Sequence, residues 1–184
     1  MNKTAIKNFA IWARNKLIAD ICYRAGLMGI TEKGIADALP QSTREAEFYD
    51  FGATEPYLVA GEAIKQRRQL VSAIREKEVD TDYATAYQYI MEEVAYTWFN
   101  RIIAIRFMEV NEYLPTRIRV LSSEDENKIE PDAVTEALDL VDELNLDREK
   151  IRNYQINNDT EELFKYIFIK QCNALGKIMP VMFE

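Results

Sequence analysis

The stretch EEVAYTWFNRIIAIRFMEVN, residues 92–111, decides how this sequence folds, because it is apolar on almost every side and reads as most of one long helix. It nevertheless carries Arg101 and Arg106. A guanidinium has five donors, so each arginine in a helical core must find a carboxylate or a carbonyl oxygen. Glu109 lies three residues after Arg106, within ion-pairing reach on a helix. Two interpretations stay open: the arginines are internal struts, or they mark a surface that contacts an anion or a protein. We predict the first, with Arg101 and Arg106 largely buried and each bonded to a carboxylate or a backbone carbonyl.

Around this stretch the sequence predicts a mainly α fold, a single helical domain of about five to seven helices around one core. Apolar residues recur at intervals of three and four through most of the chain, as they do on one face of a helix. We expect the helix of the quoted stretch to run from about residue 82 to 111. The other expected helices cover residues 3–25, 31–39, 56–77, the segment after Pro131, and the segment from about 160 to 175.

One segment has a different pattern. In TRIRVLSS, residues 116–123, Ile118 and Val120 alternate with Arg117 and Arg119. Strict alternation is typical of a half-buried strand. We therefore expect at most one short β element near residues 116–122, with an extended linker as the alternative.

The amino-acid composition excludes several classes of catalytic and cofactor-binding site. The 184 residues contain no histidine, which excludes histidine-based acid–base catalysis and histidine-ligated metal sites. The six glycines never form a Gly-x-Gly motif, which excludes the usual dinucleotide and phosphate loops. Neighbouring carboxylates such as Glu92 and Glu93 point about 100° apart on a helix and make no shared acid–base site. Cys22 and Cys172 are expected to be free thiols, and we expect no membrane span, no secretory signal and a cytoplasmic location.

The net charge of −8 is unevenly distributed. Residues 1–76 hold 11 basic and 9 acidic residues, whereas residues 121–184 hold 7 and 15. A surface that faces DNA phosphates is therefore expected in the first two thirds of the chain. The run Lys65, Arg67 and Arg68 is either a solvated helix face or a phosphate contact. The aromatic residues of the long helix are either core or a base-stacking platform: Tyr83, Tyr87, Tyr96, Trp98, Phe99 and Phe107.

At AYTWFNRIIAIRFMEVNEYLPTRIRVLSS, residues 95–123, the chain closely resembles the PglX family, the adenine-specific DNA methyltransferases of BREX phage-defence systems. The opening MNKTAIKNFAIWARNKLI, the segment EAIKQRRQLVSAI and the closing FKYIFIKQCNALGKIMPVMFE resemble matching parts of the same family. The resemblance covers the whole chain. It identifies the 184 residues as an N-terminal helical domain of such an enzyme.

The resemblance implies that the full-length protein transfers a methyl group from S-adenosylmethionine to the N6 of adenine in a short DNA site, marking host DNA as self. Its catalytic Asn-Pro-Pro-Tyr signature is absent here, because the five prolines are never adjacent, and so is its glycine-rich cofactor loop. We therefore assign no catalytic, cofactor-binding or metal residue to this chain. Seven basic residues are possible DNA-backbone or interdomain contacts: Lys65, Arg67, Arg68, Arg101, Arg106, Arg117 and Arg119.

Two main hypotheses of function follow. In the first, residues 1–184 support a catalytic domain that lies outside the chain, and they help to frame the double-stranded DNA. The apolar ending IMPVMFE predicts that the protein continues into such a domain. In the second, the domain is an adaptor that docks the methylase onto other BREX subunits through its acidic last third. A third, an acidic mimic of DNA, is disfavoured because 23 basic residues dilute the negative charge.

Overall fold

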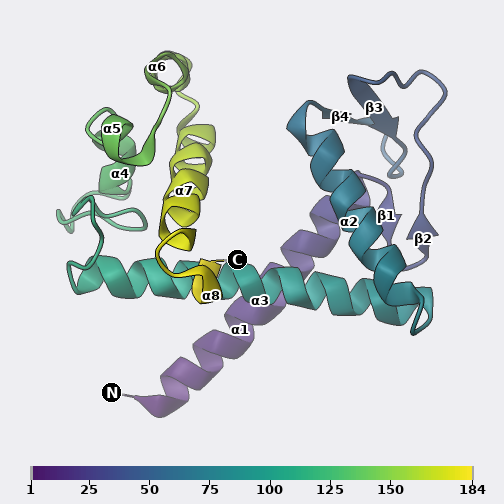
Figure 1. The fold of residues 1–184 in the computed structure, drawn as a ribbon, viewed down its shortest axis with the longest axis horizontal. Coiled ribbons are helices and arrows are strands. Elements are labelled where there is room, and N and C mark those ends of the chain that lie inside the picture. The colour runs from purple at the N-terminus through teal and green to yellow at the C-terminus, as the bar shows by residue number, and fades with distance from the viewer. Residues whose placement is uncertain (1, 184) are drawn as a thin grey trace. The chain divides into compact units, whose positions relative to one another are not determined.

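The computed structural model describes residues 2–183, and helices dominate it (Figure 1). Within these residues five helices have nine residues or more and three have four. The helices are α1 (Lys3–Leu27), α2 (Glu62–Glu78), α3 (Tyr83–Val110), α4 (Asp132–Thr135), α5 (Val141–Leu144), α6 (Arg148–Ile156), α7 (Thr160–Gly176) and α8 (Pro180–Phe183). The strands form two antiparallel hairpins: β1 (Ile30–Thr31) with β2 (Gly34–Ile35), and β3 (Ala46–Tyr49) with β4 (Tyr57–Ala60). The prediction of a mainly α fold is confirmed.

The chain forms two compact units, Met1–Trp98 and Phe99–Glu184. The boundary falls inside α3, so this helix gives its first half to one unit and its second half to the other. That residues 1–184 act as one N-terminal domain stays a prediction.

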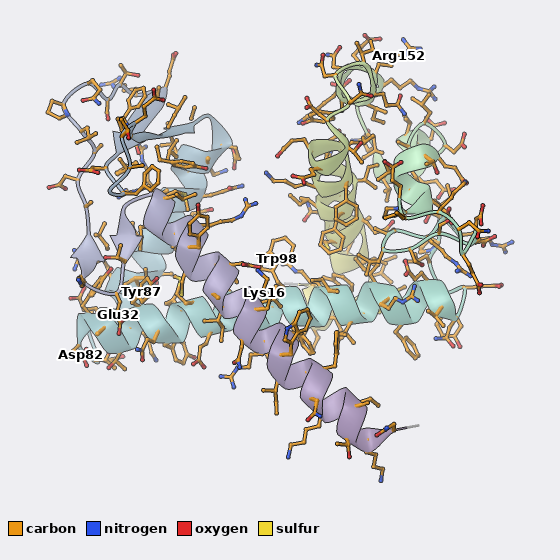
Figure 2. All side chains as sticks on the ribbon, turned by 180° about the vertical axis from the view of Figure 1, so that it is seen from behind. Lys16, Glu32, Asp82, Tyr87, Trp98 and Arg152 are labelled. Atoms are coloured by element: carbon orange, nitrogen blue, oxygen red, sulfur yellow. The ribbon has the colours of Figure 1, made fainter. Side chains whose placement is uncertain are left out.

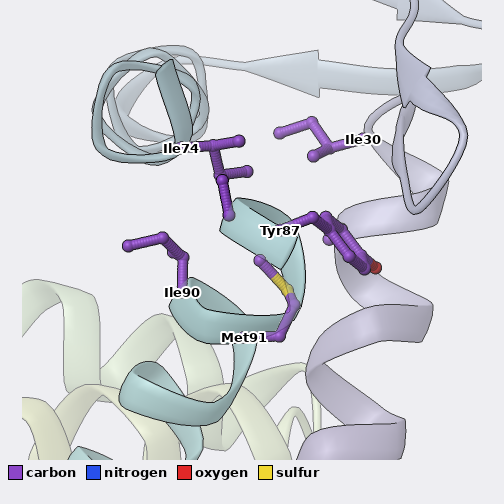
Figure 3. Close-up of a cluster of buried hydrophobic side chains, with 7 residues drawn as sticks. Ile30, Ile74, Tyr87, Ile90 and Met91 are labelled. Atoms are coloured by element: carbon purple, nitrogen blue, oxygen red, sulfur yellow. The ribbon is translucent and has the colours of Figure 1, made fainter. Parts of the chain in front are cut away.

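The main core of the first unit lies where α3 meets α1, α2 and the first hairpin. Figure 3 shows Ile74 of α2 and Ile30 of β1 beside Tyr87, Ile90 and Met91 of α3. Ile30 and Ile74 are completely buried. Residues from three helices and a strand thus share one apolar cluster, which explains why the first half of α3 is apolar on more than one side.

The second hairpin has its own small core. Its strands pair in register from Ala46 opposite Ala60 to Tyr49 opposite Tyr57. Tyr49 and Val59 pack against Ile64 of α2, and Figure 1 shows the hairpin at one end of that helix. Residues 50–56 connect β3 to β4. We did not predict the strands on either side of this connection.

The short helix predicted over residues 31–39 is wrong, because this segment forms the hairpin β1–β2. Gly29, just before it, has a φ of 72°, which favours glycine and turns the chain sharply out of α1. The Thr31 hydroxyl donates to the Gly34 carbonyl at 3.2 Å and accepts from the Lys33 N–H at 3.3 Å. Thr31, the first residue of the predicted helix, therefore closes a turn.

The helix predicted from residue 56 begins later. Residues Tyr57–Ala60 are β4, and α2 starts at Glu62 after Gly61, which has a φ of 59°. Pro56 therefore precedes a strand and does not open a helix. The apolar Leu58 and Val59, which fit the helical pattern, belong to the hairpin.

In the second unit α7 is the central helix. It contacts α4, α5, α6 and α8, and Figure 1 shows α4, α5 and α6 gathered along it. Asp147 begins α6 by accepting hydrogen bonds from the N–H groups of Glu149 and Lys150 at 2.9 and 3.1 Å. The core of this unit is made of completely or almost completely buried side chains, among them Ile105, Val120, Leu140, Ile151, Ile167 and Leu175.

The β element expected near residues 116–122 does not form; this segment is a loop without a strand partner in the described chain. The N–H groups of Val120 and Leu121 bond to the carboxylate of Glu109 at 3.0 and 2.9 Å. The Arg119 carbonyl accepts from the Ala133 N–H at 2.9 Å. A buried side chain and the start of α4 thus take the backbone groups that a neighbouring strand would use.

Candidate functional site

The seven basic candidates do not gather at one described site. Lys65, Arg67 and Arg68 belong to the first unit, whereas Arg101, Arg106, Arg117 and Arg119 belong to the second. The environments of these seven side chains differ in burial and in hydrogen-bond partners.

Arg67 is a buried strut, not part of a surface patch. Its Nε donates to the Met28 carbonyl and its Nη2 to the Ala36 carbonyl, both at 2.8 Å. Its guanidinium also lies 4.0 Å from the centre of the Tyr49 ring. Arg67 thereby ties α2 to the end of α1 and to both hairpins. The interpretation of this residue as a solvated face or a phosphate contact does not fit its burial.

Lys65 and Arg68 are exposed, but each faces a carboxylate. The Lys65 ammonium lies 3.5 Å from Glu62, and Arg68 contacts Glu47 at 2.8 Å. Glu47 also accepts from the Tyr49 hydroxyl at 2.7 Å. Burial alone would raise the pKa of Glu47, but these hydrogen bonds from Tyr49 and Arg68 hold it below its usual value. Burial and the bond to Glu47 raise the pKa of Tyr49 to about 12.

Arg101 and Arg106 have the kinds of partner that we predicted, but not the predicted burial. Arg101 is half-buried and donates to the Phe183 carbonyl at 2.7 Å. Arg106 pairs with Glu109, yet its own side chain is 50% exposed, so its expected burial is wrong. The α3 surface around Arg106 faces solvent on one side, which leaves the guanidinium partly hydrated.

Glu109 is the structural centre of this region, and the sequence reasoning gave it only the role of a partner for Arg106. Its side chain is completely buried. Besides Arg106 it accepts from the Ser122 hydroxyl at 3.0 Å and from the two backbone N–H groups described above. A buried carboxylate with this many donors fixes the loop after α3. The sequence does contain a signal for this role, because Glu109 is an acidic residue near the end of an apolar helix, directly before an irregular segment.

Asp132 fixes the same loop from its other end. It is buried and accepts from the Ser123 hydroxyl at 2.6 Å and from the Glu124 N–H at 2.8 Å. Arg119 is half-buried and donates to the Ser123 carbonyl at 3.2 Å. Arg117 is exposed, has a φ of 56°, and its side chain has no hydrogen bond or ion pair to residues 2–183. Among the seven candidates, Arg117 is the one best placed to contact a ligand.

The first turns of α1 carry an apolar surface that is uncovered in the described residues. Phe9 is 50% exposed and Trp12 61%, and their rings lie 6.1 Å apart. Ile6 and Ile11 are also exposed, and Figure 2 shows the side chains of these turns standing free of the hairpins and α2. The sequence predicted an amphipathic helix here, but its apolar stripe reaches the core only further along, at Ala13 and Ala25. Exposed apolar surface of this kind marks contacts with other proteins.

The aromatic residues of α3 divide between core and surface. Tyr87 is buried and stacks with Tyr83 at 6.3 Å, whereas Tyr96 and Phe107 are exposed. No continuous stacking platform results. Burial raises the pKa of Tyr87.

No set of described residues has the arrangement of a catalytic or metal centre. Residues 2–183 contain no cluster of metal-ligating side chains. Cys22 and Cys172 are free, as predicted, and burial raises the pKa of the Cys172 thiol to about 11, so it is a poor nucleophile.

A pocket of about 580 Å³ in the first unit is lined by the end of α1, the hairpin β1–β2, Asp50 and Phe51. It combines largely apolar walls with separate charges on Lys33 and Asp50, and offers no acid–base pair.

Comparison with known proteins shows that the chain is similar to two adenine-specific methyltransferases. The whole chain is 43% identical over 192 residues to the adenine-specific methyltransferase PglX of Lacticaseibacillus casei (strain Zhang). It is 31% identical over 196 residues to the adenine-specific methyltransferase BrxX of Escherichia coli O9:H4 (strain HS). The chain is homologous to the N-terminal region of PglX. It spans 16% of the length of PglX and 14% of that of BrxX.

The homology confirms the relationship inferred from residues 95–123 and from the two ends of the chain. No family model matches the sequence. None of the helices in residues 2–183 is long and apolar enough to cross a membrane.

Proposed function

We propose that residues 1–184 are the N-terminal helical module of a site-specific adenine-N6 DNA methyltransferase of BREX phage defence. In this proposal the module packs against the catalytic part of the protein and helps to frame double-stranded DNA in the cytoplasm. The observation that carries it is the end-to-end identity of 43% to a part of PglX. S-adenosylmethionine is the methyl donor of the full-length protein, and no residue of this chain is assigned to it.

The contacts of the basic residues support a role in protein packing more than one in reading DNA. Arg67 and Arg101 donate to backbone carbonyls, and Arg68 and Arg106 face carboxylates. Phosphate binding would have to break these contacts first. The exposed apolar stripe of α1 instead offers a surface suited to another protein part.

A second candidate function is an adaptor that binds other BREX subunits. The acidic last third favours it, since residues 121–184 carry eight more acidic than basic residues. Such a surface repels DNA and attracts a basic protein partner. The two candidate functions make different predictions for methylation by the isolated enzyme. A supporting module is required for this reaction, whereas an adaptor is not.

The test uses PglX of L. casei. One variant lacks the region homologous to this chain, and a second carries residues 1–184 in its place. Transfer of labelled methyl groups from S-adenosylmethionine to DNA is then measured with purified proteins. We expect the deletion to lose methylation and the replacement to restore it at least in part. A folded deletion variant that methylates DNA as well as the intact enzyme would contradict the supporting role and favour the adaptor.

A further inference from the structure

The first two turns of α1 form a helix on which nothing packs within the described residues. Every residue from Asn2 to Phe9 is exposed. Figure 1 shows this end of α1 pointing away from α2 and from both hairpins. A helical segment this short is only marginally stable in water when no other surface packs against it. These turns therefore need a covering surface to be firmly ordered.

An apolar stripe runs along these turns into the packed part of the helix. Its members, Ile6, Phe9, Ala10 and Ala13, have the spacing i, i+3, i+4 and i+7 with which an amphipathic helix fills a groove. Ala13 is buried and Ala10 half-buried, whereas Ile6 is 47% exposed and Phe9 50%. A surface placed over Ile6 and Phe9 would thus extend a contact that α1 already makes within the first unit.

The charge of this end of α1 indicates the chemistry of the covering surface. Residues 1–19 contain four basic side chains and no acidic one. Arg14 and Lys16 already pair with carboxylates, whereas Lys3 and Lys7 form no ion pair with any of residues 2–183. Lys3 and Lys7 are four residues apart, on one side of the apolar stripe. An apolar groove with carboxylates at its rim matches both features, whereas DNA would meet the lysines and leave the stripe in water.

The small size of the stripe favours a covering surface in the same polypeptide. A stable interface between separate proteins takes about 20–30 residues on each side, far more than these turns offer. A surface that is covalently linked binds at a high effective concentration, so a few side chains are enough. The chain spans 16% of the length of PglX, so most of such a protein lies outside residues 1–184.

We propose that the first turns of α1 insert Ile6 and Phe9 into an apolar groove on the part of the same polypeptide that lies outside residues 1–184, with Lys3 and Lys7 at its acidic rim. The inference rests on the proposed function and deepens it, because it names the element through which the module docks on the rest of the enzyme. Its test measures amide protection and not methylation, so the two proposals fail separately.

Hydrogen–deuterium exchange of residues 3–12 tests the docking. It is compared between the 184-residue chain alone and the PglX variant that carries residues 1–184 in place of its own homologous region. We expect these amides to exchange at least about tenfold more slowly in the PglX variant, because the helix must undock before it opens. Equal exchange would overturn the inference, even in a variant that methylates DNA. The same comparison on PglX itself, intact against its homologous region alone, does not depend on the folding of the variant.

Other occupants of the stripe give different results in the same experiment. Protection that is already present in the chain alone, and rises with its concentration, would assign the stripe to a second copy. Protection that appears only when duplex DNA or vesicles of anionic phospholipid are added would assign it to nucleic acid or to a membrane surface. Each of these results would overturn the proposal.

Phe9→Gln and Ile11→Gln are a matched pair. The two side chains are equally exposed, at 50% and 51%, but Ile11 lies about 160° around the helix from Phe9 and outside the stripe. Phe9→Gln should abolish the added protection and Ile11→Gln should keep it, while both leave the thermal midpoint of the chain alone nearly unchanged. An equal loss in both variants would contradict docking through the stripe. Lys7→Glu should also lower the protection, and a higher protection would contradict an acidic rim.

Discussion

Arg67 and Lys65 lie two residues apart on α2, and their contacts predict opposite responses to the same change. Arg67→Met leaves the carbonyls of Met28 and Ala36 without their donors, so we expect a loss of about 2–4 kcal/mol in the free energy of unfolding. Lys65→Met removes an exposed ion pair and should change it by less than about 0.5 kcal/mol. Urea unfolding of both variants measures this. Equal effects would mean that Arg67 is not a strut.

Glu109 and Arg106 form one ion pair whose two members differ in burial. The Glu109 carboxylate accepts four hydrogen bonds. In Glu109→Gln the amide NH₂ would face one of these donors, so we expect the variant to destabilise the fold by about 2–4 kcal/mol. Arg106→Met should lower stability by only about 1 kcal/mol or less, because the guanidinium is half exposed and Glu109 keeps its other donors. Thermal melts of the two variants test this order. A larger effect at Arg106 would contradict it.

These residues show what local sequence can and cannot reveal. The pairing of Arg106 with Glu109 was predictable, because a spacing of three on a helix fixes it. The partners of Arg67 lie 39 and 31 residues away along the chain, so only the folded hairpin and α1 bring them to it. The second role of Glu109, as acceptor for the loop after α3, depended in the same way on a contact that no local pattern encodes.

At the scale of the elements, two glycines at the end of α1 make a matched pair. A Cβ at Gly29 would lie 3.0 Å from the Ala36 Cβ and from the Tyr49 ring, at a φ of 72°. Gly29→Ala should therefore lower the free energy of unfolding by about 2–3 kcal/mol. Gly26 is helical with open space around it, so Gly26→Ala should raise that free energy by about 0.5–1 kcal/mol. Chemical unfolding distinguishes them; two variants of equal stability would rule out a special turn at Gly29.

Asp82 begins α3 and makes its stability sensitive to acid. Its carboxylate accepts from the Thr85 hydroxyl at 2.6 Å and from the Thr85 N–H at 3.1 Å, and these bonds lower its pKa below the usual 3.8. A lowered pKa contributes stability above the unfolded-state value, and that contribution is lost as the pH falls through the folded-state value. Asp82→Ala should therefore reduce the thermal midpoint near neutral pH, and this reduction should shrink as the pH falls below the usual pKa of 3.8.

The Asp82→Asn variant is the control, because an amide oxygen can still accept the Thr85 N–H but does not titrate. Its midpoint should lie between those of the wild type and the alanine variant at neutral pH. A difference between wild type and Asp82→Ala that stays constant with pH would mean that the carboxylate charge has no part in capping.

Helices were easier to predict than hairpins in this chain for a physical reason. α3 extends over Tyr83–Val110, close to the predicted 82–111, because its apolar pattern is long and Pro115 follows it. The hairpin strands have two to four residues each, too short for a periodic pattern to distinguish them from a helical turn. In residues 116–122 the apolar Val120 is buried, as the alternating pattern predicted. Its N–H donates to the Glu109 carboxylate, however, and not to a neighbouring strand, so no strand forms.

At the scale of the whole molecule, the relationship to adenine-specific methyltransferases was predictable from the sequence, whereas the contact residues were not. A family resemblance can be seen in long, specific stretches of sequence even when the fold is not known. The comparison with PglX confirms the resemblance found here. Which cations remain available to a partner depends on tertiary contacts. Among the seven candidates, these contacts engage Arg67, Arg101 and Arg119 with carbonyls and place Lys65, Arg68 and Arg106 beside carboxylates. They leave the Arg117 side chain without a partner in the described chain.

The central claim is that residues 1–184 support a methyltransferase and do not themselves read DNA. Its most direct test is titration of a labelled DNA duplex with this chain alone, from low to physiological salt, with and without a methylation site of PglX. We predict binding that is independent of sequence and no tighter than about 10⁻⁴ M at physiological salt, because only Arg117 of the seven candidate cations lacks a partner in residues 2–183 and the last third is acidic. Site-specific binding at micromolar concentration and physiological salt would contradict the account.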